Sequence, residues 1–249
     1  MNTKITVIAA IVLLMSVQVH ATTIYGTVTM DYTGFGASDS MTVWGGGLNG
    51  QSVTVGALTF NKTNGTGDGQ YLDNGSIGVF CIDLLEYVGS GTKTYDVIMP
   101  QDGPRPTSFL GGGMGQAKAD YLSELWGRYY DSAWTSGGTY TTQQKKNAEA
   151  FAAAVWEIVY EDVPSAPMYW DVTVDSTLGG KGFKASNLDY QTANSWLRSL
   201  NGTGPMADLR ALSNLGSQDF IVAMNIPEPA TIALAVLGLF LVSKRRIAK

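Results

Sequence analysis

The sequence predicts an α+β fold, in which a β-rich antiparallel domain, sandwich-like or barrel-like, contains a central helical hairpin. Two observations predict this class. β-Branched and aromatic runs alternate with glycine over residues 23–60, as in half-buried antiparallel strands. Two amphipathic patterns then follow each other over 117–131 and 143–161, as in a pair of helices. An apolar segment at each end adds a signal peptide and a hydrophobic tail helix to this domain.

Strands are expected where β-branched and aromatic residues dominate, both in the first half of the chain and near its end. A Gly- and Asn-rich stretch without apolar periodicity, residues 61–76, predicts a loop between two groups of strands. The expected strands lie within residues 23–32, 41–47, 52–60, 77–88, 93–99 and 219–226.

The two central helices each carry one apolar stripe. The second helix is preceded by Thr141 and Gln144, which have the spacing of a capping box. A third, shorter helical segment is expected over 189–200. The stripes consist of Ala119, Leu122, Trp126 and Tyr129 in the first helix, and of Ala148, Phe151, Ala152, Val155, Trp156 and Val159 in the second.

Residues 1–21 have the three parts of a secretory signal peptide. Lys4 gives a charged start, residues 5–15 form an apolar run, and a small-residue site ends at Ala21, the expected cleavage residue. An N-terminal membrane anchor is the alternative, but the run is short and no stop-transfer pattern follows it. The single histidine, His20, lies in this segment, so the mature protein should contain none.

The last residues of the chain combine a proline motif, a short apolar span and a basic end. Pro227, Glu228 and Pro229 precede an apolar stretch over 230–242. As a helix this stretch is roughly 20 Å long, which is less than the ~30 Å hydrocarbon core of a bilayer. It is therefore a weak transmembrane segment, and its positive end should stay in the cytoplasm. The basic end consists of Lys244, Arg245, Arg246 and Lys249.

This tail resembles the PEP-CTERM sorting signal of Gram-negative bacteria, in which the same three features accompany an N-terminal signal peptide. The resemblance implies processing by an exosortase, a membrane transpeptidase-like enzyme. It also implies passage through the inner membrane, transient anchoring by the tail, and a final place at the surface or in the extracellular matrix of a bacterium that makes exopolysaccharide. The expected units are a signal peptide at 1–21, an exported domain at 22–226 and a sorting tail at 227–249.

The exported part of the chain is acidic. Five of the 16 basic residues lie outside residues 22–229, whereas all 21 acidic residues, Glu228 included, lie within that range. Residues 22–229 therefore carry a formal net charge of about −10, against −5 for the whole chain. A domain with this charge is not expected to bind nucleic acid or anionic lipid by electrostatic attraction.

The only cysteine, Cys81, follows Phe80 in a predicted strand, and the second central helix contains the sequence Ala-Val-Trp-Glu. These two motifs resemble those of the thioester domains of bacterial surface proteins, in which a strand cysteine attacks a glutamine amide on a helix. The resemblance covers residues 23–226 loosely, and its specific motifs are short. It places Cys81, Ala152 and Trp156 at the motif positions.

The chain departs from that family at one decisive position. The family's glutamine should lie four residues before the tryptophan, where this chain has Ala152, and a methyl group offers no acyl carbon. Gln143 and Gln144 lie more than two helical turns upstream, so neither can replace it. The fold is therefore expected without the thioester. Cys81 is expected to be a small buried hydrophobe with a raised thiol pKa, and an intermolecular disulfide is its main reactive alternative.

Carboxylates and aromatic residues give two further candidates for chemistry. Glu157 and Glu161 lie four apart on one helix, where they are expected to be solvated, and Asp83 and Glu86 lie near the cysteine in sequence. Glycosidases need two carboxyl groups that flank a substrate. Trp134, on a Ser-, Gly- and Thr-rich loop, is the candidate ligand aromatic for a sugar, with core packing as the alternative.

We therefore expect a non-enzymatic structural, adhesion or exopolysaccharide-associated protein. An exported carbohydrate-active enzyme of unrecognised type is the alternative, and converging carboxylates in one pocket would favour it. No cofactor or metal is expected. The expected partners are an exosortase and components of the cell envelope.

Overall fold

The computed structural model describes residues 22–105, 112–177 and 182–226. They form a β-rich antiparallel sheet accompanied by three α-helices, so the predicted α+β class is confirmed. The predicted signal peptide with Ala21 and the predicted sorting tail from Pro227 lie outside the described residues. Among the helices that are described, none has the length and apolarity that a membrane crossing requires.

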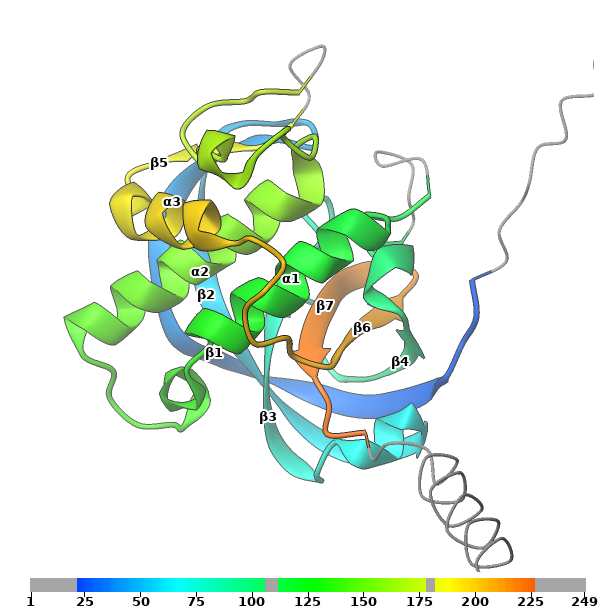
Figure 1. The fold of residues 1–249 in the computed structure, drawn as a ribbon. Helices are drawn as coiled ribbons and strands as arrows, with labels where there is room; N and C mark the ends of the chain where they lie inside the picture. Colours follow the sequence, from blue (N-terminus) through cyan, green and yellow to red (C-terminus); the bar gives the residue numbers. More distant parts are fainter. Residues whose placement is uncertain (1–21, 106–111, 178–181, 227–249) are drawn as a thin grey trace, which may run out of the picture.

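The described strands and helices follow one another in a simple order (Figure 1). The strands are β1 (Gly26–Gly45), β2 (Leu48–Gly67), β3 (Gly75–Cys81), β4 (Thr92–Ile98), β5 (Lys184–Ser186), β6 (Leu209–Asn214) and β7 (Ser217–Ala223). The α-helices are α1 (Gln116–Tyr129), α2 (Thr142–Tyr160) and α3 (Tyr190–Ser199). The short 3₁₀ helices are η1 (Asp68–Tyr71), η2 (Pro100–Asp102), η3 (Ser132–Thr135) and η4 (Pro167–Tyr169).

The strand pairings close the sheet on itself. Strands pair antiparallel in the order β2-β3-β7-β6-β4-β1, and β1 also pairs with β2 to complete the circuit. Phe60, Tyr95 and Phe220 meet inside this circuit, with the rings of Phe60 and Phe220 5.0 Å apart. These side chains come from strands that are not neighbours in the circuit, so the aromatic contacts fill its interior.

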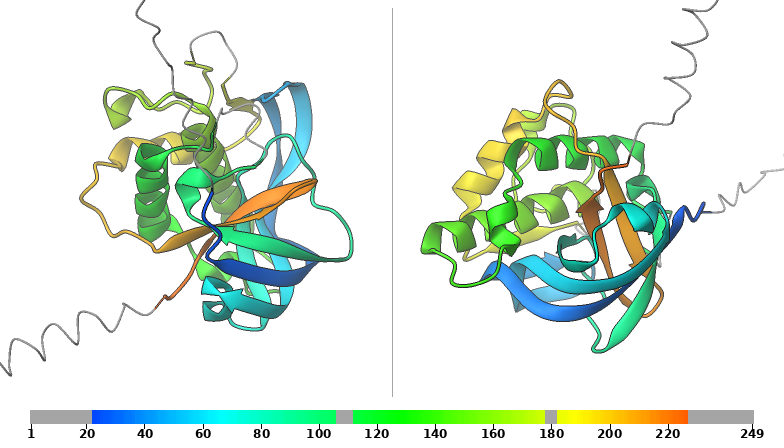
Figure 2. Two further views of the ribbon diagram at one scale, coloured as in Figure 1. Left: turned by 90° about the vertical axis from the view of Figure 1, so that its right-hand side faces the viewer. Right: turned by 90° about the horizontal axis from the view of Figure 1, so that it is seen from below.

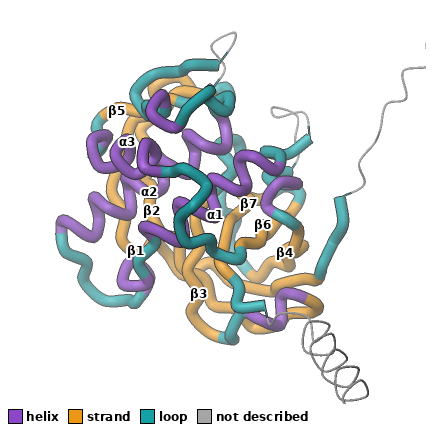
Figure 3. Tube along the Cα trace, in the orientation of Figure 1, coloured by secondary structure: helices purple, strands orange, loops and turns teal. Residues whose placement is uncertain are grey.

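The β1–β2 hairpin has two halves with different surroundings. In the inner half, residues 26–35 and 58–67, β1 also pairs with β4 and β2 also pairs with β3. In the outer half, residues 36–45 and 48–57, β1 pairs with β5, whereas β2 has no second strand partner among the described residues. Figure 3 shows β1 and β2 behind α2, which packs against both strands.

The sequence prediction was wrong about the lengths of these strands. Residues 61–67, expected to be a loop, continue β2, because their backbone pairs with the start of β1 and the Thr27 and Thr66 hydroxyls hydrogen-bond at 2.9 Å. The short strands expected over 23–60 are instead parts of two 20-residue strands. Register shifts in their pairing, one of them between Phe35 and Ser38, let the hairpin bend without ending.

The helices lie together on one side of the strands, as the right-hand view of Figure 2 shows. The expected capping box is confirmed, because Thr141 Oγ1 accepts a hydrogen bond from Gln144 N and Gln144 Oε1 accepts one from Thr141 N. Lys118 Nζ, near the start of α1, donates to Val159 O near the end of α2 at 2.9 Å. This contact brings opposite ends of the two helices together.

Candidate functional site

A cavity of about 610 Å³ lies between the outer half of β2, the turn at residues 83–88 and α2. Its volume is in the range of pockets that bind small molecules. Most of its wall is apolar, with some polar side chains that come from β2, the turn, α2 and β7. The apolar wall includes Phe35, Leu48, Val53, Val55, Leu58 and Leu84.

The cavity exists because β3 leaves β2 early. The last pairing of β3 with β2 joins Val79 to Leu58, after which Phe80 and Cys81 pair with β7 instead. The next residue continues toward β7, since Ile82 N donates to a β7 carbonyl oxygen. The space beside β2 that a longer β3 would occupy is therefore left to the cavity. The expected strand over 77–88 ends at Cys81 for this reason.

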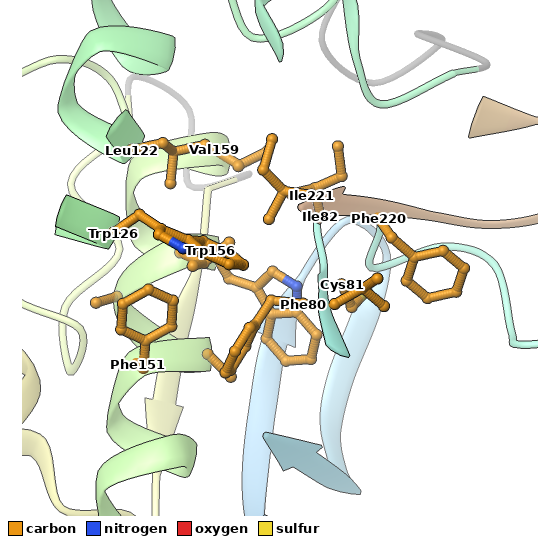
Figure 4. Close-up of a cluster of buried hydrophobic side chains, with 14 of the residues drawn as sticks. Phe80, Cys81, Ile82, Leu122, Trp126, Phe151, Trp156, Val159, Phe220 and Ile221 are labelled. Carbon is orange, nitrogen blue, oxygen red and sulfur yellow. The ribbon is translucent and has the colours of Figure 1, made fainter. Parts of the chain in front are cut away.

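The three thioester-motif positions, Cys81, Ala152 and Trp156, all line this cavity. Cys81 ends β3, while the other two lie one turn apart on α2. Figure 4 shows Cys81 and Trp156 on neighbouring elements, with Phe80 and Phe151 packed beside them. The ring centroids of Phe80 and Phe151 are 4.7 Å apart, which fixes the strand end against the helix.

Cys81 is a free, buried cysteine, as expected. Its thiol donates to Asp83 O at 2.9 Å, and its sulfur accepts from Asp83 N at 3.2 Å. Burial raises the thiol pKa well above its usual value, and the Asp83 charge raises it further. The Trp156 indole N–H acts in the opposite direction. Trp156 Nε1 is buried and has no hydrogen-bond partner among the described residues.

Two carboxylates, Asp83 and Glu86, also line the cavity, and both belong to the same turn. Asp83 is buried, and its Oδ1 accepts from Leu85 N at 2.8 Å. Burial raises the Asp83 pKa, and the charge of Glu86 adds to that rise. Glu86 Oε2 is buried without a hydrogen-bond partner among the described residues. The turn therefore gives this cavity a negative wall, and the residues that line it include no lysine or arginine.

Gln218, at the start of β7, is a cavity residue that sequence reasoning missed. Its Nε2 donates to Asp83 O at 3.2 Å, and the Cys81 thiol donates to the same oxygen. The Cys81 thiol and the Gln218 carboxamide thus lie close together, because both donate to the same carbonyl oxygen. The only sequence signal was that Gln218 directly precedes a predicted strand, which does not reveal its partner strand.

The expectation of an exposed Trp134 was wrong. Its side chain is 1% exposed, because η3 turns the indole inward from the loop that follows α1. The ring contacts Phe80 and Phe151, with centroid distances of 6.0 and 5.4 Å. Trp134 therefore belongs to the core and offers no face to a sugar in this structure.

The expectation that Glu157 and Glu161 are solvated was also wrong, since both are buried. Glu157 Oε1 accepts from Asp171 N at 3.0 Å, and Glu161 Oε2 accepts from Ser176 N at 2.8 Å. Burial raises the pKa of both carboxyl groups. They hold the loop that follows α2, and neither lines the cavity at Cys81.

The described residues contain no group of three or more Asp, Glu, Cys or His side chains arranged to hold a metal ion. The residues that line the cavity thus supply one thiol, two carboxylates of a single turn, one indole N–H, two carboxamides and three hydroxyl groups, set in a mostly apolar wall. The carboxamides are those of Gln51 and Gln218, and the hydroxyl groups are those of Ser52, Thr54 and Tyr87. In comparisons with known proteins, no family model, curated protein or solved structure matches this chain.

Proposed function

We propose that the protein is an exported, non-enzymatic binding module of the cell surface or extracellular matrix. In this proposal an exosortase sorts it through Pro227, Glu228 and Pro229, the tail anchors it briefly in the inner membrane, and its partners are exopolysaccharide or other envelope components. The order of signal peptide, acidic domain and Pro-Glu-Pro tail supports this proposed location outside the cell.

One observation carries the non-enzymatic part of the proposal. Cys81, Ala152 and Trp156 line one cavity, as the motif positions of a thioester-type domain would, but position 152 supplies only a methyl group. No histidine lies among the described residues to activate the thiol, whose pKa burial raises. The arrangement supports a pocket that binds without forming a covalent bond.

The second candidate, an exported carbohydrate-active enzyme, is favoured by the presence of two carboxylates in the cavity. Asp83 and Glu86 both reach it, and the Asp83 pKa is raised, as in a general acid. However, the two groups lie on one turn, whereas glycosidases place carboxyl groups on opposite sides of the scissile bond. Release of reducing ends from the host's exopolysaccharide, lost in both D83N and E86Q, would establish the enzyme.

Mass analysis of the mature protein tests the sorting part of the proposal. In a host with an exosortase, the mature protein should lack its basic C-terminal end. Replacing Pro227, Glu228 and Pro229 by alanine should leave a form that retains the tail in the inner membrane. If wild type and variant have the same mature C-terminus, the sorting proposal is wrong.

The intact mass of the denatured protein tests the absence of a reactive bond. We expect the full sequence mass of the mature chain and uptake of one thiol label, because Cys81 has no acyl donor at position 152. A mass lower by one ammonia would contradict the proposal and would direct attention to Gln218, the carboxamide next to the thiol.

A further inference from the structure

The outer half of β2 has an open strand edge. Residues 48–57 pair with β1 on one side only, and the pairing of β2 with β3 begins at Leu58. On the other side of the same hairpin, β5 covers the edge of β1 at Thr42–Trp44. Within the described part of the chain, the outward backbone N–H and C=O groups of residues 48–57 therefore have no strand partner, and the cavity lies directly beside them.

The turn at residues 83–88 runs along this edge without pairing to it. Leu84 and Leu85 reach the tip of the hairpin, where they lie next to Gly46. Between the turn and the edge lies the cavity, with Ala152 and Trp156 of α2 also in its wall. A strand placed beside β2 here would continue the line that β3 follows up to Val79, its last residue paired with β2.

Proteins normally protect an open edge with charged residues, proline or a covering element. The sequence of residues 48–57, Leu-Asn-Gly-Gln-Ser-Val-Thr-Val-Gly-Ala, contains no proline and no charged residue. It contains β-branched residues at three successive positions, Val53, Thr54 and Val55, in the middle of the edge. The edge is thus favourable for strand pairing, and it is unprotected beside a cavity that can receive side chains.

The charges around the cavity decide the kind of partner. Asp83 and Glu86 are its charged side chains, and Glu86 Oε2 is buried without a hydrogen-bond donor among the described residues. A basic side chain would supply that donor and offset the negative charge. A second copy of this acidic chain would bring the same two carboxylates to the interface, which disfavours self-pairing.

We propose that the open edge of β2 binds an extended segment of a partner protein by strand addition, with apolar side chains of the segment in the cavity and a basic side chain at Glu86. This inference rests on the proposed binding function but not on the proposed sorting. Main-chain hydrogen bonds to residues 48–57 supply affinity, and the cavity supplies preference for particular side chains. The partner is a peptide with alternating apolar and basic residues.

A synthetic peptide, acetyl-Val-Lys-Val-Thr-Val-Lys-amide, tests this inference on the full-length protein. We expect binding in a calorimetric titration, together with slower amide hydrogen exchange, by about tenfold or more, at residues 48–57. Exchange in β6 and β7, which pair within the circuit, should not change. Absence of binding at millimolar peptide would overturn the proposal.

Two altered peptides separate strand addition from other kinds of binding. Methylation of alternate backbone nitrogens, on the edge that faces β2, removes the hydrogen bonds but keeps the side chains, and it should abolish protection of the edge. Replacing both lysines by glutamate should weaken binding about tenfold or more. Equal binding of the methylated peptide would show a side-chain pocket without strand addition and would overturn the proposal.

Variants of the protein complete the test. V53K places a positive charge on the open edge and should weaken binding of the lysine peptide about tenfold, whereas T63K, on the same strand but outside the cavity, should not. Sedimentation should show a monomer at the concentrations used. A dimer that V53K dissociates would show that the edge serves a second copy, which would overturn the choice of partner. None of these outcomes depends on where the chain is sorted.

Discussion

The two halves of the β1–β2 hairpin are one continuous pair of strands, but they meet different requirements. The inner half has a strand neighbour on both sides and surrounds an aromatic interior that includes Phe60 and Phe220. The outer half has a neighbour only at β5, and Gln51, Ser52 and Thr54 on its open edge are exposed. From this comparison we infer that the two halves have different roles. The inner half provides stability, and the outer half provides a binding surface.

The largest expected effect belongs to the aromatic interior that the inner half surrounds, at Phe220 of β7. Phe220 is fully buried and contacts the rings of Phe60 and Tyr95 at 5.0 and 5.7 Å. F220A should lower the free energy of unfolding by about 3–5 kcal/mol, because it leaves a cavity among these rings. V53A, at the half-buried open edge, should lower it by less than about 1 kcal/mol. Urea unfolding measures both, and similar losses would refute the division between the two halves.

A pH dependence should also originate in the closed circuit to which the inner half belongs, at Asp219 of β7. Burial raises the pKa of this carboxyl group from 3.8 to about 7, against the opposing hydrogen bond from Arg105 N at 2.6 Å. The raised pKa means that the folded state binds the proton more tightly than the unfolded state. This contribution is complete below pH 3.8 and is lost as the pH rises to about 7. It has an upper bound of about 4 kcal/mol.

Urea unfolding between pH 4 and 8 measures this loss, and D219N should flatten the profile. The matched control is D39N, because the backbone N–H of Ser40 and the ammonium of Lys146 lower the Asp39 pKa, so that it titrates below this window. If the free energy of unfolding falls with rising pH as much in D219N as in the wild type, the pH dependence belongs to the other buried carboxyl groups.

The sequence predicted the local features of this fold better than its long-range pairings. The capping box at Thr141 and Gln144 and the three helices were predicted because their signals lie within a few residues of one another. The sequence left open whether the strands form a sandwich or a barrel, because closure of the circuit depends on pairings such as β1 with β4 and β3 with β7, between segments far apart in the chain. β6 was missed for the same reason.

The candidate site, too, was predicted only where it depends on local sequence patterns. The motif positions Cys81, Ala152 and Trp156 were identified from sequence, but the open edge and Gln218 depend on where β3 leaves β2. The burial of Glu157 was missed because an amphipathic stripe predicts one buried face. α2 packs against strands as well as α1 and α3, so every residue from Ala148 to Tyr160 is buried.

Substitution A152Q tests whether the outer cavity is a thioester site that has lost its acyl donor. Ala152 lies on the cavity wall, so a glutamine there should place a carboxamide near Cys81 and lower stability by about 1–3 kcal/mol if the amide is unsatisfied. Mass spectrometry of the denatured variant should reveal a fraction that has lost one ammonia. The loss should disappear in the double variant A152Q/C81A, whereas its absence in A152Q would leave the family resemblance without chemical support.

The smallest expected change in stability is that of E86Q. This variant separates a role of Glu86 in stability from a role in binding, because the two properties should change in opposite directions. Burial raises the Asp83 pKa, and the Glu86 charge raises it further, so the two like charges disfavour each other in the folded state. E86Q removes one charge and keeps the size of the side chain, and it should therefore raise the free energy of unfolding by about 0.5 kcal/mol, as measured by urea unfolding at pH 7. The same variant should weaken binding of the lysine peptide, since the basic side chain loses its partner. If E86Q gains stability and loses affinity for the peptide, Glu86 is a residue retained for binding. If E86Q instead destabilises the protein and binds the peptide normally, the turn at residues 83–88 serves only the fold.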